Sequence, residues 1–134
     1  MEFMTLMAST PELAHFTGEH AMTPYMLFGA RGIYSWFINF NPRYVLDWYQ
    51  DIVDGRWDMA IARQKRMHAF IQAKAILEGA GNFHAIVNKA MSAASPFLVE
   101  SNHTRKPYLP VAKETVKQFQ QIVAAQFADL LWNG

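Results

Sequence analysis

The chain has 134 residues, of which 51% are hydrophobic and 14% aromatic. It is long enough for one ordinary domain, and this composition excludes a disordered chain. The 12 basic and 11 acidic side chains leave a net charge of +1, so no basic surplus is present to neutralise nucleic-acid phosphates. The absence of cysteine excludes disulfides, thiolate zinc sites and a cysteine nucleophile. Apolar runs stay shorter than the roughly 20 residues of a membrane span. We therefore expect a cytoplasmic globular protein that binds neither nucleic acid nor a membrane.

The first 56 residues alternate between helix and strand patterns. Residues 1–8 are apolar at nearly every position and indicate a helix, which Pro11 interrupts. Short strands are predicted over residues 13–17 and 32–37, the second rich in aromatic and β-branched side chains. Helices are predicted after each strand, over residues 19–29 and 41–54. A strand–helix–strand order predicts two parallel strands joined by a right-handed crossover.

The remainder of the chain is predicted to be helical. Helices are expected over residues 57–78, 84–95 and 113–131, the last with a strongly amphipathic pattern. On the first of these helices, the run from Arg63 to Arg66 is interpreted as a solvated face, and Lys74 is expected to point outward.

Two strands cannot form a stable sheet under so many helices. The element order fits an α/β protein that comprises strands 7 and 8 of a (β/α)₈ barrel, with their helices, and a three-helix C-terminal appendage. The corresponding domains are residues 1–56 and 57–134. A complete barrel takes about 250 residues, so we expect a fragment that leaves Phe16, Ile33 and Phe37 uncovered. Such a fragment is expected to form a homo-oligomer or to bind a missing N-terminal portion.

Several short motifs occur in one order along the chain. Thr17-Gly18-Glu19 follows the first predicted strand, Gly29-Ala30-Arg31-Gly32 opens the second, and Ser35 and Asn39 come next. Arg105, Pro107 and Pro110 precede the last helix. This collinear set resembles strands seven and eight and the C-terminal region of the dihydrodipicolinate synthase and N-acetylneuraminate lyase family.

The resemblance implies a class I Schiff-base aldolase or lyase acting on a 2-oxo acid such as pyruvate. In this family a lysine at the end of strand six forms the imine, and a tyrosine on strand five shuttles the proton. The resemblance implies that neither residue lies in this chain, so the chain alone is expected to be inactive. It also implies no cofactor, and the histidines lack the paired spacing of metal ligands.

The resemblance further assigns substrate-binding positions. Gly18 and the backbone near Tyr34 would approach the 2-oxo acid end of the substrate. Glu19, His20, Ser35 and Trp36 would face its variable half, where the indole disfavours a polyhydroxylated sugar acid. Trp36, together with Asn88 on the first appended helix, also resembles the hydratase-aldolases that cleave benzylidenepyruvates.

Each of these positions has a purely structural alternative. Trp36 can pack in a core, His20 can be a solvated loop residue, and Glu19 can simply begin a helix. Asn88 can lie on a helix surface, and Tyr34 and Ser35 point to opposite faces of a strand. Two other functions also stay open for the whole chain, namely a non-catalytic remnant that needs a partner chain and a free-standing helical interaction module.

Overall fold

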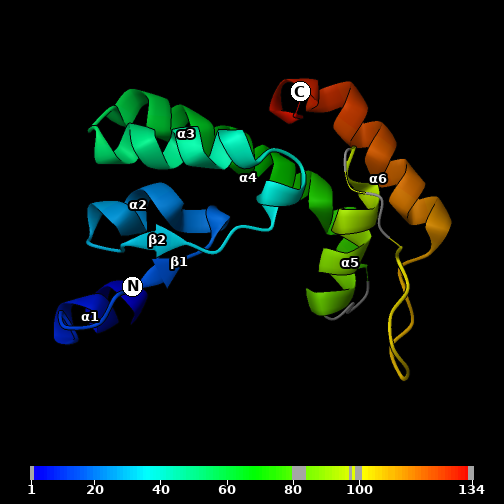
Figure 1. Cartoon of the computed structure of the whole chain (residues 1–134), viewed down its shortest axis with the longest axis horizontal. Coiled ribbons are helices and arrows are strands. Elements are labelled where there is room, and N and C mark those ends of the chain that lie inside the picture. Colours follow the sequence, from blue (N-terminus) through cyan, green and yellow to red (C-terminus); the bar gives the residue numbers. More distant parts are fainter. Residues whose placement is uncertain (1, 80–83, 97, 99–100, 133–134) are drawn as a thin grey trace. The chain divides into compact units, whose positions relative to one another are not determined.

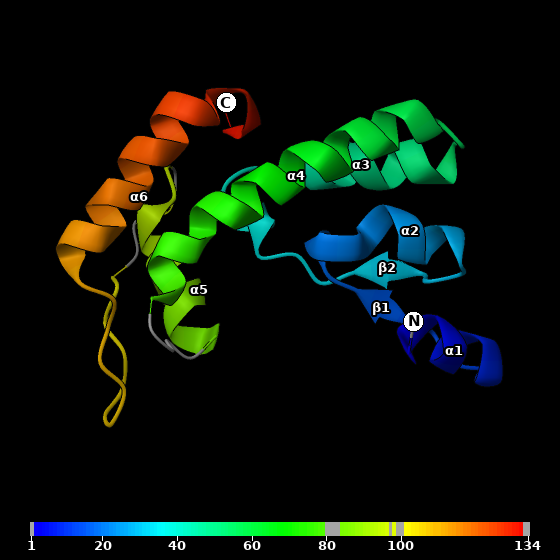
Figure 2. The ribbon, with the colours of Figure 1, turned by 180° about the vertical axis from the view of Figure 1, so that it is seen from behind.

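The computed structural model describes residues 2–79, 84–96, 98 and 101–132. The chain divides into two compact units, Met1–Ser35 with Tyr44–His68 and Trp36–Arg43 with Ala69–Gly134. The long helix α4 (Trp57–Glu78) contributes its first half to one unit and its second half to the other. Figures 1 and 2 show the ribbon from opposite sides.

The first unit contains the only sheet in the described part of the chain. Helix α1 (Glu2–Ser9) is followed by β1 (Phe16–Thr17), the short 3₁₀ helix η1 (Glu19–Ala21), α2 (Met22–Leu27) and β2 (Gly32–Ile33). The two strands pair in parallel, with Phe16 opposite Gly32 and Thr17 opposite Ile33. In both views α2 lies beside the strands (Figures 1 and 2). The predicted parallel pairing is confirmed, although each strand has two residues, shorter than predicted.

A buried carboxylate joins α3 (Pro42–Val53) to the first half of α4. Asp51 is 4% exposed, and its two oxygens accept hydrogen bonds from Arg56 Nε at 2.8 Å and Arg63 Nε at 2.7 Å. The Arg63 guanidinium also lies 5.0 Å from the centre of the Tyr44 ring. The predicted solvated face is therefore wrong for Arg63, because the arginine packs between two side chains of α3.

The charge state of Asp51 links this contact to pH. Burial alone would raise the pKa of Asp51, but the hydrogen bonds and positive charges of Arg63 and Arg56 outweigh burial and hold that pKa below its ordinary value. A carboxyl whose pKa is lower in the folded state stabilises the fold above its unfolded-state pKa of about 3.9, and this contribution is lost as pH falls through the folded-state value.

We therefore expect the melting temperature of the chain to fall as the pH is lowered from 5 to 3, and Asp51→Asn to flatten this part of the profile. Thermal unfolding followed by circular dichroism measures both. Glu12→Gln, which changes an exposed carboxylate, is the matched control and should keep the wild-type slope. Equal slopes for wild type and Asp51→Asn would contradict the assignment.

The second unit is built on a cluster of phenylalanine rings. Phe37, Phe40, Phe70 and Phe119 have no exposed surface, and Phe127 is 3% exposed. Neighbouring ring centres lie 5.0–6.3 Å apart, from Phe37–Phe70 to Phe40–Phe119. Each fully buried ring contributes about 1.5–3 kcal/mol of transfer free energy, so this cluster makes a large apolar contribution to the unit.

The cluster explains why the predicted strand over residues 32–37 is wrong beyond Ile33. Residues Phe37–Asn39 form the 3₁₀ helix η2, which places Phe37 and Phe40 on one side, with ring centres 5.8 Å apart. Asn39 Nδ2 then donates to Ser92 Oγ at 3.0 Å. The expectation that Phe37 is uncovered is also wrong, because its ring is completely buried.

Helices α5 (His84–Ala94) and α6 (Lys113–Gln126) complete the second unit, followed by η3 (Ala128–Leu130). The predicted helix over residues 113–131 is interrupted at Phe127, whose backbone leaves the helical region at φ −133°. Lys74 is also not outward as predicted, since it is 6% exposed. Its Nζ donates to Glu78 at 2.5 Å and lies 5.6 Å from the Trp36 ring centre.

The described residues thus form a mostly helical α/β structure with one small parallel sheet. Among them, no helix combines the length and the apolar composition that a membrane crossing requires.

Large apolar side chains remain exposed in the first unit. Leu27 is 61%, Phe28 59% and Leu46 63% exposed. Exposing about 300 Å² of apolar surface costs roughly 7 kcal/mol at 25 cal/mol per Å², which rivals the roughly 5–15 kcal/mol stability of a small domain. Association with another chain would remove this cost.

We therefore expect the purified chain to associate with itself, with a mass by light scattering that increases with concentration. The double variant L27K/L46K should shift the distribution toward the monomer, whereas Gln50→Lys, which changes an exposed polar residue on α3, should not. A monodisperse wild-type monomer that unfolds cooperatively and binds no apolar dye would refute this expectation.

Candidate functional site

The predicted site residues of the first unit follow the carboxyl ends of the two strands. Gly18 comes directly after β1, and Tyr34 directly after β2. The Tyr34 N–H donates to the Thr17 carbonyl at 2.8 Å, and the Arg31 N–H donates to the His15 carbonyl at 2.8 Å. These two bonds extend the parallel pairing on both sides of the strands, so that both strand ends lie at one edge of the sheet.

The Phe16 ring lies against the partner strand. A Cβ atom at Gly32 would come within 2.6 Å of this ring, so only glycine allows the ring to cover the strand. Phe16 also contacts the Tyr34 ring, with centres 5.5 Å apart. The glycine that opens the second strand thus makes room for an aromatic side chain beside the strand ends.

A side-chain amide of α4 holds the turn that follows β1. Gln64, 9% exposed, donates from Nε2 to the carbonyls of Glu19 at 2.8 Å and His20 at 3.2 Å. Its Oε1 accepts the Thr23 N–H at 3.0 Å. This N–H belongs to the first turn of α2, where helical partners are missing, and Ala21 at the N-cap makes no side-chain capping bond.

Three further bonds hold the same turn and the start of α2. His68 Nε2 donates to the His20 carbonyl at 2.8 Å, one helical turn after Gln64. The Thr23 hydroxyl donates to the Ala60 carbonyl at 3.2 Å and accepts from Trp48 Nε1 at 2.9 Å. The turn from Gly18 to Ala21 is therefore hydrogen-bonded to α4. The start of α2 is hydrogen-bonded to both α3 and α4.

A cavity of about 300 Å³ opens beside this turn. Two predicted site residues, Gly18 and His20, contribute to its wall. A Cβ atom at Gly18 would lie 3.0 Å from His20 Nδ1, so the glycine lets the imidazole fold back over the backbone. The rest of the wall comes from the aromatic residues Phe3, Phe16 and Tyr25 and from Thr17.

Three rings from different elements meet at the cavity. Phe3 of α1 and Tyr25 of α2 have ring centres 4.8 Å apart, and Tyr25 meets His20 edge to face at 6.4 Å. An imidazole can donate or accept a hydrogen bond, so His20 supplies a polar group beside these rings. A mainly aromatic wall with a few polar groups suits a small organic ligand.

The remaining predicted residues of the first unit lie in different environments. Glu19 is 2% exposed, whereas Tyr34 is 77% exposed. The Ser35 hydroxyl is buried, and it has no hydrogen-bond partner among the residues that the structure describes. A buried polar atom of this kind has the capacity to bind a ligand or a further chain.

Trp36 and Asn88 belong to the second unit. The indole of Trp36 stacks on Phe70 at 5.9 Å with an interplanar angle of 27°, and the Lys74 ammonium lies over it. Trp36 follows β2 rather than lying within a strand. Asn88 is on α5, and its buried Oδ1 lacks a hydrogen-bond partner within the described part of the chain.

The family was identified by comparison with known proteins. The model of the dihydrodipicolinate synthetase family matches residues 2–126. The chain belongs to this family. Among curated proteins, no sequence matches it significantly.

Four residues of the candidate site are not predicted from the sequence. Phe3 and Tyr25 line the cavity, and Gln64 and His68 hold the turn. The only available signal was Gln64 itself, a neutral residue within a basic run. The predicted solvated face from Arg63 to Arg66 is wrong for Gln64, because its amide is buried. In the described ranges no group of three or more His, Asp or Glu side chains could hold a metal ion.

We expect that replacing the Gln64 amide destabilises the turn that follows β1. Gln64→Leu fills a similar volume but removes the Gln64 bonds to the Thr23 N–H and the Glu19 carbonyl, whereas the His20 carbonyl keeps its bond from His68. We expect a loss of about 2–4 kcal/mol in the free energy of unfolding, because each buried polar group left unpaired costs about 1–3 kcal/mol. Urea unfolding measures the loss, and amide exchange should show faster exchange at Thr23.

Gln72→Leu, at an exposed position of the same helix, is the matched control and should change stability by less than about 0.5 kcal/mol. Similar losses for both variants would mean that the Gln64 bonds do not stabilise the turn.

Proposed function

We propose that this chain is the C-terminal portion of a Schiff-base-forming aldolase or lyase that acts on a 2-oxo acid of the pyruvate type. In this proposal its two strands are strands 7 and 8 of a (β/α)₈ barrel, and its later helices are a C-terminal appendage. The observation that carries the proposal is the cavity lined by Gly18 and His20 after the carboxyl end of β1, in a chain of the dihydrodipicolinate synthetase family. In barrel enzymes this end of the strands carries the active site.

In the proposed reaction this chain contributes a wall of the substrate site rather than the reacting amine. Gly18 and the backbone near Tyr34 take the 2-oxo acid end, and His20 faces the variable half. The aromatic side chains of Phe3, Phe16 and Tyr25 favour an apolar variable half over a polyhydroxylated one. Roles for Glu19, Ser35, Trp36 and Asn88 remain predictions from the sequence.

The imine-forming lysine is proposed to come from outside these residues. All six lysines lie in the described ranges, on α4, α5, α6 and the loop before α6. None of the six follows a strand. An imine lysine must be placed beside the bound 2-oxo group with its amine activated, and in barrel enzymes the catalytic side chains come from the carboxyl ends of strands.

The isolated chain should consequently fail to trap pyruvate. Treated with pyruvate and borohydride, it should show no stoichiometric adduct by mass spectrometry. Addition of a polypeptide that supplies strands one to six of a family barrel should restore trapping, on a lysine of the added polypeptide. A stoichiometric adduct on one lysine of the isolated chain would refute the proposal, and assembly without trapping would favour a non-catalytic interaction module.

The contribution of the wall is tested in the assembled protein. His20→Gln should raise KM for the substrate with its variable half but change the borohydride trapping of pyruvate little. His84→Gln is the matched control, because His84 is an exposed residue of α5 and does not line the cavity. Equal effects of the two substitutions would place His20 outside the substrate site.

A further inference from the structure

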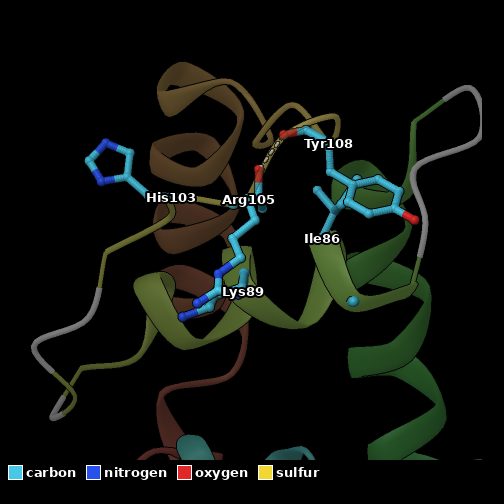
Figure 3. A pocket seen from close by; sticks show the side chains of 7 residues that line it. Ile86, Lys89, His103, Arg105 and Tyr108 are labelled. Atoms are coloured by element: carbon cyan, nitrogen blue, oxygen red, sulfur yellow. Dashed lines mark hydrogen bonds between the residues drawn. The ribbon is translucent and has the colours of Figure 1, made fainter.

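The second unit contains a larger cavity of about 540 Å³. Its wall comes from α5, which supplies Ile86 and Lys89, and from the loop before α6, which supplies Arg105 and Tyr108 (Figure 3). Sites for small molecules typically enclose about 300–1,000 Å³, so this cavity has the size for a ligand with one ring.

The cavity has a cationic end and an apolar end. In Figure 3 the Arg105 side chain extends from the loop toward α5, which carries Lys89, while the Tyr108 ring lies over Ile86 away from the guanidinium. The loop is held in this shape by two bonds, from Tyr108 N–H to the Arg105 carbonyl at 3.0 Å and from the Thr104 hydroxyl to the Tyr108 carbonyl at 2.6 Å. The arrangement presents two positive groups and an aromatic face to one space.

The charges of the wall select the sign of a ligand. None of the seven described residues that line the cavity is acidic, whereas Lys89 and Arg105 are both basic. An anion placed between two cations gains Coulomb energy from each of them. The planar guanidinium matches a carboxylate through two parallel hydrogen bonds, and the ammonium adds a third donor group.

The apolar end of the cavity favours a particular shape for the uncharged part of the ligand. Tyr108, 51% exposed, and Ile86, 7% exposed, both line this end of the cavity. A flat ring stacked on a tyrosine buries apolar area and gains a favourable aromatic contact. A flexible or hydroxylated group would gain less binding free energy from contact with Tyr108 and Ile86.

We propose that this cavity binds a small aromatic carboxylate, with its carboxylate held by Arg105 and Lys89 and its ring against Tyr108 and Ile86. The site is separate from the cavity at Gly18 and His20, and it needs neither an imine nor the rest of a barrel.

The test uses 4-fluorobenzoate as the probe, titrated with the 134-residue chain and followed by ¹⁹F NMR. The wild-type chain should bind the probe saturably. Arg105→Gln should weaken binding about tenfold, the effect expected for the loss of a charge-assisted hydrogen bond. Tyr108→Ala should weaken it several-fold. Circular dichroism checks that each variant folds like the wild type.

Matched variants and competing ligands decide the outcome. Lys89→Gln should weaken binding, whereas Lys117→Gln on α6 should not; Leu109→Ala, at a neighbouring residue that is 80% exposed, should leave binding unchanged. Neutral 4-fluorobenzamide that binds as well as the probe would overturn the role of the charge. Inorganic phosphate that displaces the probe at equal concentration would overturn the role of the ring. Equal losses for Arg105→Gln and Lys117→Gln would overturn the site.

Discussion

The bonds of the Gln64 amide are the constraint on which the candidate site of the first unit depends. One side chain accepts the Thr23 N–H and donates to the carbonyls of Glu19 and His20, so it ties the turn after β1 and the start of α2 to the middle of α4. A glutamine amide can do this because it carries both an acceptor and two donors. Since the group is buried, its loss would remove all three of these bonds at once, and of the three partners the His20 carbonyl would keep its bond from His68.

Local signals were sufficient to predict the elements that depend on local physics. The helices α3, α4 and α5 match the predicted ranges closely, because their apolar periodicity and the flanking proline and glycine act within a few residues. The parallel pairing of the strands was also predictable, since it follows from the strand–helix–strand order. The capping of α2 was not, because its acceptor comes from Gln64, 41 residues away.

The incorrect predictions share one physical origin. The local sequence is compatible with either a buried or an exposed position for these residues, and tertiary packing decides which one is adopted. Phe37 suits a strand by propensity, yet a 3₁₀ helix lets its ring join four other buried phenylalanines. Lys74 is predicted to point into solvent, but its side chain is buried. Its ammonium group contacts Glu78 and the Trp36 ring. For the site, Gly18 and His20 were found because they follow a strand, while Phe3 and Tyr25 resemble ordinary core residues until the cavity is seen.

Each unit is stable for reasons that do not involve the sheet. Two strands of two residues form very few ladder bonds, whereas the first unit is held by the Gln64 and Asp51 networks and the second by its phenylalanine cluster. The sheet therefore serves to align two strand ends, with Phe16 paired opposite Gly32 and its ring against that glycine. Strands of this length are stable within a larger sheet, where neighbours satisfy the outer N–H and C=O groups. Under the proposed function the missing barrel strands would be those neighbours, and they would bring the reactive lysine to a wall that the helices have already positioned.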